Sequence, residues 1–194
     1  MSEEMWIVNK AIIGNQITAF AKRQDSEGST LECIVGIPDD KAKNAMRDKK
    51  TFLYIDHAYF KRGWHTGNFR AVRDDVHLTK IVPRPDDRMK MYGVKVEPWR
   101  KTGREIVLIP PSMMQAKLYG LTNWVLETEN LLMRYTGRPM TVKHTKTTGM
   151  RDYCRDAWAV VTYASVAGVE ASLMGIPVFS TEHCPSWPVC AGPL

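Results

Sequence analysis

The residues best suited to chemistry stand late in the chain, where an apolar run ends at Thr162. Ser165 follows, Glu170 stands five positions later, and the segment closes with Gly-Ile-Pro-Val at 175–178. In an open α/β sheet, ligands bind beyond the carboxyl ends of the strands, where helix N-termini present free backbone N–H groups. Ser165 can cap such a helix and face a phosphate, and the Glu170 carboxylate can accept hydrogen bonds from ribose hydroxyls. The spacing is compatible with a nucleotide site, and an ordinary capped helix with one solvated glutamate is the alternative.

This segment resembles the donor half of glycosyltransferases of the GT-B fold. In that half, a strand ending in a Thr or Ser-rich loop leads into a helix bearing a Glu, followed by Gly-Ile-Pro-Val. Two further stretches are similar to the first strand and phosphate-side loop of that half, at 106–112, and to its strand with a basic residue, at 141–144. Segments 54–60 and 68–70 are similar to those of small glycosyltransferase-like proteins encoded by bacteriophages.

The resemblance implies transfer of a sugar from a nucleotide sugar held between two lobes. It implies that Glu170 contacts the ribose and that the helix end at Ser165 contacts the pyrophosphate. The further nucleotide or phosphate contacts that it implies are Ser112, Lys143, His144 and Thr162. Enzymes of this fold commonly neutralise the leaving diphosphate with protein groups in place of a metal ion, so we expect no metal and no cofactor besides the nucleotide-sugar substrate. For Lys143, His144 and Lys146, a solvated basic strand end is the alternative.

An inverting transfer also needs a base within hydrogen-bond reach of the acceptor hydroxyl. Asp56 and His57 are the best candidates because they follow the buried strand predicted at 51–55 and so stand at its carboxyl end. His65 and His77 are poorer candidates. A structural role is the alternative for this pair, and a retaining enzyme need not use such a base.

Composition favours an acidic partner without identifying it. The chain of 194 residues has 27 Lys and Arg against 21 Asp and Glu, a formal net charge of +6. The stretch 57–104 mixes basic and aromatic residues as binding loops do. The residues that we expect to contact an acceptor such as modified DNA, or another nucleic acid, are Arg70, Arg73, Lys80 and Arg84. Two other functions stay open: a non-catalytic nucleic-acid-binding phage factor, and a sugar-nucleotide epimerase or hydrolase.

Alternating apolar runs and amphipathic stretches must position these residues. Strands are predicted at 31–35, 51–55, 105–109, 140–142, 157–162 and 177–179, with helices at 15–23, 39–46, 121–135 and 165–174. This order predicts an α/β protein with two Rossmann-like lobes and parallel sheets, a GT-B-like and possibly reduced fold. We expect an acceptor-side lobe at 1–85, a crossing segment at 86–104 and a donor-nucleotide lobe at 105–194. The chain is shorter than usual for the fold, so we expect a reduced fold or a shortened form.

The remaining features indicate a protein of the cytoplasm, or of the host cytoplasm if phage-encoded. The first residues are acidic, whereas a secretory peptide begins with basic ones. The apolar stretch 157–179 is long enough to span a bilayer, but Glu170 and the Gly-Ile-Pro break favour a buried strand, helix and strand. The four cysteines fit reduced thiols. A zinc site at His183, Cys184 and Cys190 lacks an evident fourth ligand.

Overall fold

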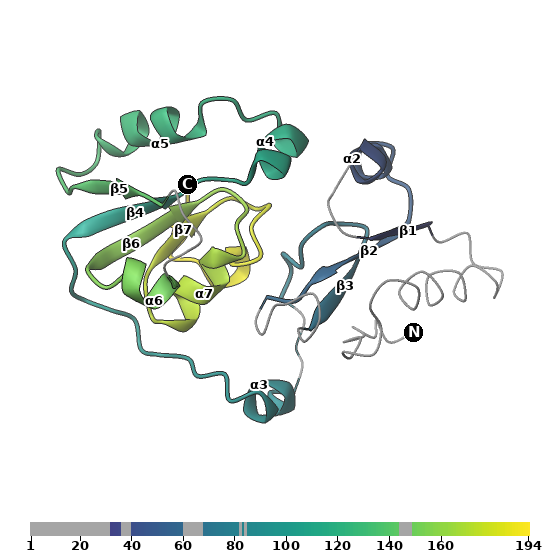
Figure 1. Ribbon diagram of the computed structural model, residues 1–194, viewed down its shortest axis with the longest axis horizontal. Helices are drawn as coiled ribbons and strands as arrows, with labels where there is room; N and C mark the ends of the chain where they lie inside the picture. Colours follow the sequence, from purple (N-terminus) through teal and green to yellow (C-terminus); the bar gives the residue numbers. More distant parts are fainter. Residues whose placement is uncertain (1–31, 36–39, 60–67, 82, 84, 144–148) are drawn as a thin grey trace. The chain divides into compact units, whose positions relative to one another are not determined.

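The structure is a computed structural model that describes residues 32–35, 40–59, 68–81, 83, 85–143 and 149–194. The chain divides into two compact units, Met1–Leu78 and Thr79–Leu194. The helix predicted at 15–23 and the candidate residues His65, Arg84, His144 and Lys146 lie outside the described residues. Figure 1 shows the helices and strands of each unit.

The first unit contains a three-stranded sheet in the order β1-β2-β3. Strand β1 (Glu32–Val35) and β2 (Phe52–His57) run parallel and are joined through helix α2 (Asp40–Arg47). Strand β3 (Phe69–Arg73) returns antiparallel to β2. The expected parallel pair is therefore present, but the described part of this unit adds a small antiparallel hairpin in place of a further parallel strand.

The second unit is built on a five-stranded parallel sheet in the order β5-β4-β6-β7-β8. The strands are β4 (Glu105–Ile109), β5 (Met140–Val142), β6 (Ala157–Thr162), β7 (Val178–Ser180) and β8 (Gly192–Pro193). Its helices are α3 (Asp87–Met91), α4 (Met113–Tyr119), α5 (Trp124–Leu132), α6 (Met150–Tyr153), α7 (Ala167–Leu173) and the 3₁₀ turn η1 (Trp187–Val189). Among the described residues, this unit forms one parallel α/β lobe, which confirms the α/β class.

Helices cover both faces of the parallel sheet, which explains why its strands are continuous apolar runs (Figure 1). On one face, residues of α6 and α7 pack around Val107, Val160 and Val178. On the other, residues of α5 pack on Ile106 and Leu108. The stretch 157–179 forms β6, α7 and most of β7, as predicted, and none of the helices in the described ranges is long and apolar enough to cross a membrane.

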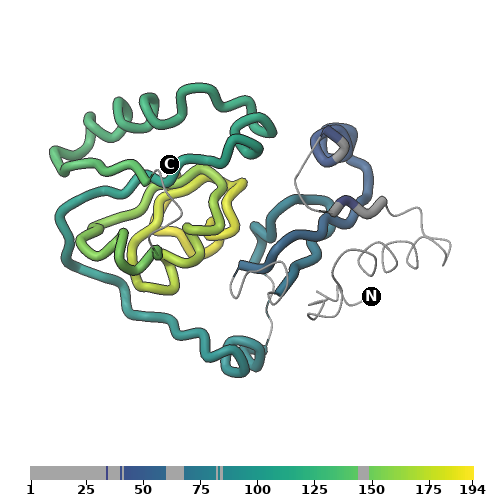
Figure 2. The backbone as a smooth tube through the Cα atoms, in the orientation of Figure 1, coloured from purple at the N-terminus to yellow at the C-terminus, as the bar shows by residue number. Residues whose placement is uncertain are grey.

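An extended strap joins α3 to β4 and belongs to the second unit (Figure 2). The backbone N–H of Glu97 donates to Leu173 O at 2.9 Å, and that of Arg100 donates to Gly175 O at 2.6 Å. Gly175 has φ +69°, and a Cβ there would overlap the carbonyl oxygen of Pro98. The strap can lie this close to the turn after α7 because residue 175 is glycine.

Candidate functional site

The carboxyl ends of the five parallel strands meet at one edge of the second unit. The chain leaves β4 for β5 on one side and later returns to β6 on the other, so the strand order reverses between β4 and β6. Open α/β sheets bind ligands at such a reversal. Residues 110–112 and 163–165 follow these two strands and are therefore the loops to examine.

Ser112 caps helix α4 in the loop after β4. Its Oγ accepts a hydrogen bond from the backbone N–H of Gln115 at 3.2 Å, while its own N–H donates to Gln115 Oε1 at 2.9 Å. The Gln115 Nε2 group then donates to Ala164 O at 2.7 Å. One side chain thus joins the two loops at the reversal, and the exposed Ser112 hydroxyl keeps a proton to donate.

Ser165 lies two residues before α7, whose N-cap is Val166, so the expected helix cap is displaced by one residue. Its hydroxyl accepts a hydrogen bond from the Ala167 N–H at 3.2 Å, and its carbonyl accepts one from Gly168 N–H at 3.0 Å. A Cβ on Gly168 would lie 2.6 Å from Ser186 Oγ. The helix start is therefore packed tightly against the loop that follows β7.

Lys143 and Glu170 both act on the buried thiol of Cys154. Burial raises the pKa of this thiol to about 11; Lys143 and Arg100 lower it, and Glu105 and Glu170 raise it. The Lys143 Nζ lies 4.4 Å from the ring centre of Tyr153, whose hydroxyl donates to Val142 O at 2.8 Å. Lys143 therefore lies beside α6, and Glu170 lies in α7, which packs on the same face of the sheet.

Thr162 is fully buried at the end of β6. Its hydroxyl donates to Ile109 O at 2.9 Å and joins the ends of β6 and β4. This side chain faces protein groups, so its contribution to the site is to hold the two strand ends together.

An aromatic cluster at the same edge was not predicted. Tyr119 of α4 stacks on His183 at 4.6 Å between ring centres, and Tyr163 lies 5.2 Å from Tyr119 and 5.7 Å from His183. Burial, with a smaller effect of Glu182, raises the pKa of Tyr163. The signal available in the sequence was that Tyr163 directly follows an apolar strand and His183 lies three residues beyond another.

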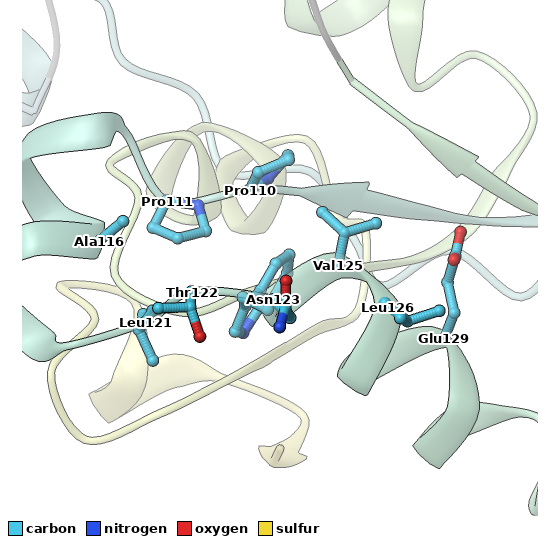
Figure 3. Close-up of a pocket in the computed structure, with 10 residues that line it drawn as sticks. Pro110, Pro111, Ala116, Leu121, Thr122, Asn123, Val125, Leu126 and Glu129 are labelled. Atoms are coloured by element: carbon cyan, nitrogen blue, oxygen red, sulfur yellow. The ribbon is translucent and has the colours of Figure 1, made fainter.

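A groove of about 370 Å³ lies between the loop after β4 and the beginning of α5 (Figure 3). Its lining residues come from one continuous stretch of chain, Pro110, Pro111, Ala116, Leu121, Thr122, Asn123, Trp124, Val125, Leu126 and Glu129. This groove was not expected from the sequence, because the intervening helix α4 was not predicted. The Ser112 and Gln115 capping-box spacing is the signal that indicates α4.

Asp56 and His57 project from opposite faces of β2 in the first unit. The Asp56 Oδ2 atom lies 3.3 Å from Arg70 Nη2, whereas the His57 ring stacks on Phe69 with 5.1 Å between ring centres. Adjacent residues of a strand alternate between its faces. The structure therefore does not bring these two candidate bases together, and each has its own surroundings.

Arg70 lies in a buried network, while Arg73 and Lys80 are exposed. The Arg70 Nη2 group donates to Val76 O at 3.0 Å and to His77 Nδ1 at 3.2 Å, and the Arg70 Nη1 group donates to His57 O. The guanidinium lies 4.8 Å from the ring centre of Tyr59. Of the three described basic residues expected to contact an acceptor, Arg70 is thus held by protein groups.

The described residues contain no group of three or more His, Cys, Asp or Glu that could hold a metal ion. No protein family model matches the chain. No curated protein matches it either.

Proposed function

We propose that the chain is a glycosyltransferase-like protein that transfers a sugar from a nucleotide sugar to an acceptor. In this proposal the fold is GT-B-like, with the second unit as the donor-nucleotide lobe and the first unit as the acceptor-side lobe. The observation that carries it is the reversal of strand order between β4 and β6, where Gln115 Nε2 joins the loops that follow these two strands. Open α/β sheets bind nucleotides at such a reversal, and Lys143 and Glu170 follow strands β5 and β6 of the same sheet.

In the donor site, each group has a task that its chemistry allows. The Glu170 carboxylate accepts hydrogen bonds from ribose hydroxyls, and the Lys143 ammonium offsets charge on the leaving diphosphate. The Ser112 and Ser165 oxygen atoms accept backbone hydrogen bonds, and both residues retain their hydroxyl protons for phosphate oxygens. His144, also implied by the resemblance, would add a further phosphate contact.

In the first unit, Asp56 is the better-placed base for an inverting transfer. Its side chain is 28% exposed, so a carboxylate oxygen can reach an acceptor hydroxyl. His57 packs its ring on Phe69 and follows as the second candidate.

A polyanionic acceptor such as modified DNA would contact exposed basic groups. Arg73, whose side chain is 61% exposed, and Lys80 meet this requirement. Contacts of this kind weaken steeply with added salt. If DNA is the acceptor, Arg73→Gln and Lys80→Gln should each reduce the salt dependence of DNA affinity.

Nucleotide binding tests the proposal directly. We expect UDP or another nucleoside diphosphate to raise the Tm of the chain. The Glu170→Gln substitution should weaken the binding of that nucleotide by about tenfold, because hydrogen bonds to a charged group contribute about 1.5–3 kcal/mol. Glu182→Gln changes an exposed carboxylate that follows β7 and serves as the matched control. The proposal fails if no nucleotide binds by calorimetry or thermal shift.

Product analysis then separates the reactions that one nucleotide site can support. A labelled sugar nucleotide should transfer its sugar to an acceptor. Release of free sugar, or a change of configuration in the intact sugar nucleotide, would instead assign hydrolysis or epimerisation.

A further inference from the structure

The groove between the loop after β4 and α5 has a chemistry different from that of the donor site. Lys143 and Glu170 belong to the α6–α7 side, whereas α5 packs on the opposite face of the sheet. Figure 3 shows Pro110 and Pro111 on one side of the groove, Leu121 and Thr122 on the other, and Glu129 at one end.

The lining residues are mostly apolar in type, but polar atoms make up nearly half of the lining surface, and one residue is charged. Seven of the ten lining residues are apolar, Thr122 and Asn123 are polar, and Glu129 supplies the one charge; no Lys or Arg is among them. A diphosphate would meet no cation in the groove and would be repelled by Glu129. The groove therefore suits an apolar group that has a positive charge next to it.

The outer side of α5 extends the same chemistry. Leu126, Glu129 and Met133 are three and seven positions apart, so they follow one side of the helix. Leu126 is 59% exposed and Met133 is 61% exposed. The helix α5 carries two carboxylates, Glu127 and Glu129, and no basic residue, although the chain as a whole has a net charge of +6.

We propose that this groove docks a peptide segment of a partner protein in which an apolar side chain is followed by Lys or Arg. The apolar side chain fills the space between the two prolines and Leu121, and the basic group meets the Glu129 carboxylate. A volume of about 370 Å³ is near the lower end of the roughly 300–1,000 Å³ of small-molecule sites, which suits one large side chain. Buried anchors of this kind carry much of the energy of protein interfaces.

Two matched peptides test the charge requirement on the ¹⁵N-labelled chain. The probes are Ac-Gly-Trp-Lys-Gly-NH₂ and Ac-Gly-Trp-Glu-Gly-NH₂, titrated at low salt. We expect the Lys peptide to shift the amide signals of Thr122, Val125 and Leu126 and to bind about threefold to fivefold more tightly than the Glu peptide. An exposed ion pair contributes at most about 1 kcal/mol, which sets the size of this preference.

Two substitutions on the same helix assign the effect to the groove. Glu129→Gln should abolish the preference for the Lys peptide, whereas Glu127→Gln, which changes a carboxylate outside the lining, should retain it. Amide spectra of both variants check that each is folded. Shifts elsewhere on the chain, equal binding of the two peptides, or binding of neither would overturn the proposal. The same amide shifts produced by raising the concentration of the chain alone would indicate a second copy as the occupant and would overturn the proposal too.

Discussion

The two units place their polar groups in different ways. In the second unit, apolar side chains fill both faces of the parallel sheet, and most of the candidate donor groups lie near or beyond the strand ends. In the first unit, one face of the hairpin holds a charged network around Arg70. A polar group at a strand end can serve a ligand without disturbing the core, whereas a charge buried on a sheet face must be satisfied by the protein itself. We therefore expect the stability of the second unit to depend most on close backbone packing, and that of the first unit to depend most on the polar network around Arg70.

Gly175→Ala should have the largest effect and tests close packing in the second unit. The added methyl would overlap Pro98 O and would also adopt an unfavourable positive φ. We expect a loss of about 4 kcal/mol or more in the free energy of unfolding of this unit. Peptide-resolved hydrogen exchange in urea measures the two units separately.

Gly120→Ala is the control for backbone strain alone. Gly120 also has φ +69°, but no atom lies within 4 Å of the Cβ position. This change should cost about 1 kcal/mol. Equal losses of unfolding free energy for the two variants would show that the close approach of the strap to Gly175 adds nothing to the cost of backbone strain.

Arg70→Met should have the next largest effect and tests the network in the first unit. The change leaves Asp56 without its cation and removes the hydrogen bonds to Val76 O and His77. We expect the free energy of unfolding of the first unit to fall by about 3 kcal/mol. Hydrogen exchange of β2 and β3 gives the measurement.

Arg73→Met is the matched control on the same strand. Its exposed guanidinium pairs with Asp74 at 3.5 Å, so its loss should change stability by less than about 0.5 kcal/mol. If the two arginine variants were equally stable, the comparison between an internal network and a solvated surface would be wrong.

The same contrast explains which elements could be predicted from the sequence. The strands at 105–109, 140–142 and 157–162 were predicted with the bounds that the structure has, because they are apolar runs bounded by Gly, Pro or charged residues. Strand β3 was missed, because Arg70 and Arg73 make its sequence resemble a binding loop. Local sequence predicts that an arginine is exposed to solvent. The groups that bury Arg70 come from other parts of the chain, so its burial could not be predicted from β3 alone.

The candidate site shows a similar division. The placement of Ser165 just before α7 followed from local spacing, although the N-cap position itself is Val166. The hydrogen bond from Gln115 to Ala164, which spans 49 positions, could not be predicted from local patterns. The opposite directions of Asp56 and His57 did follow from strand alternation, once β2 was known to extend through His57.

Alkaline pH tests how well the core of the second unit excludes charge. Burial raises the pKa of the Cys154 thiol from its ordinary value of 9.0 to about 11. Between these values the unfolded chain releases the proton before the folded chain does, so stability present below about pH 9 should be lost as the pH rises to about 11. The loss should reach at most about 3 kcal/mol.

Cys154→Ala isolates this contribution. Its free energy of unfolding should fall less steeply than that of the unchanged protein between about pH 9 and 11, as measured by urea unfolding at several pH values. The half-buried Cys190 should react with a thiol reagent in the folded protein before Cys154 does. Identical pH slopes for the two proteins would contradict a charge-excluding core at Cys154.

Substitutions of Ser112 should change stability less than those of Gly175 and Arg70, and they separate the structural role of the carboxyl edge from its role in binding. Ser112→Ala removes the cap of α4 and should lower the free energy of unfolding by about 1 kcal/mol. Asp caps helices about as well as Ser, so Ser112→Asp should keep the stability of the unchanged protein. If the edge holds a diphosphate, the new carboxylate repels it, and calorimetry should show weaker nucleotide binding by Ser112→Asp than by Ser112→Ala. The less stable variant would then be the better binder. A nucleotide affinity that follows stability in both variants would assign Ser112 to the cap alone and would leave the donor site without this residue.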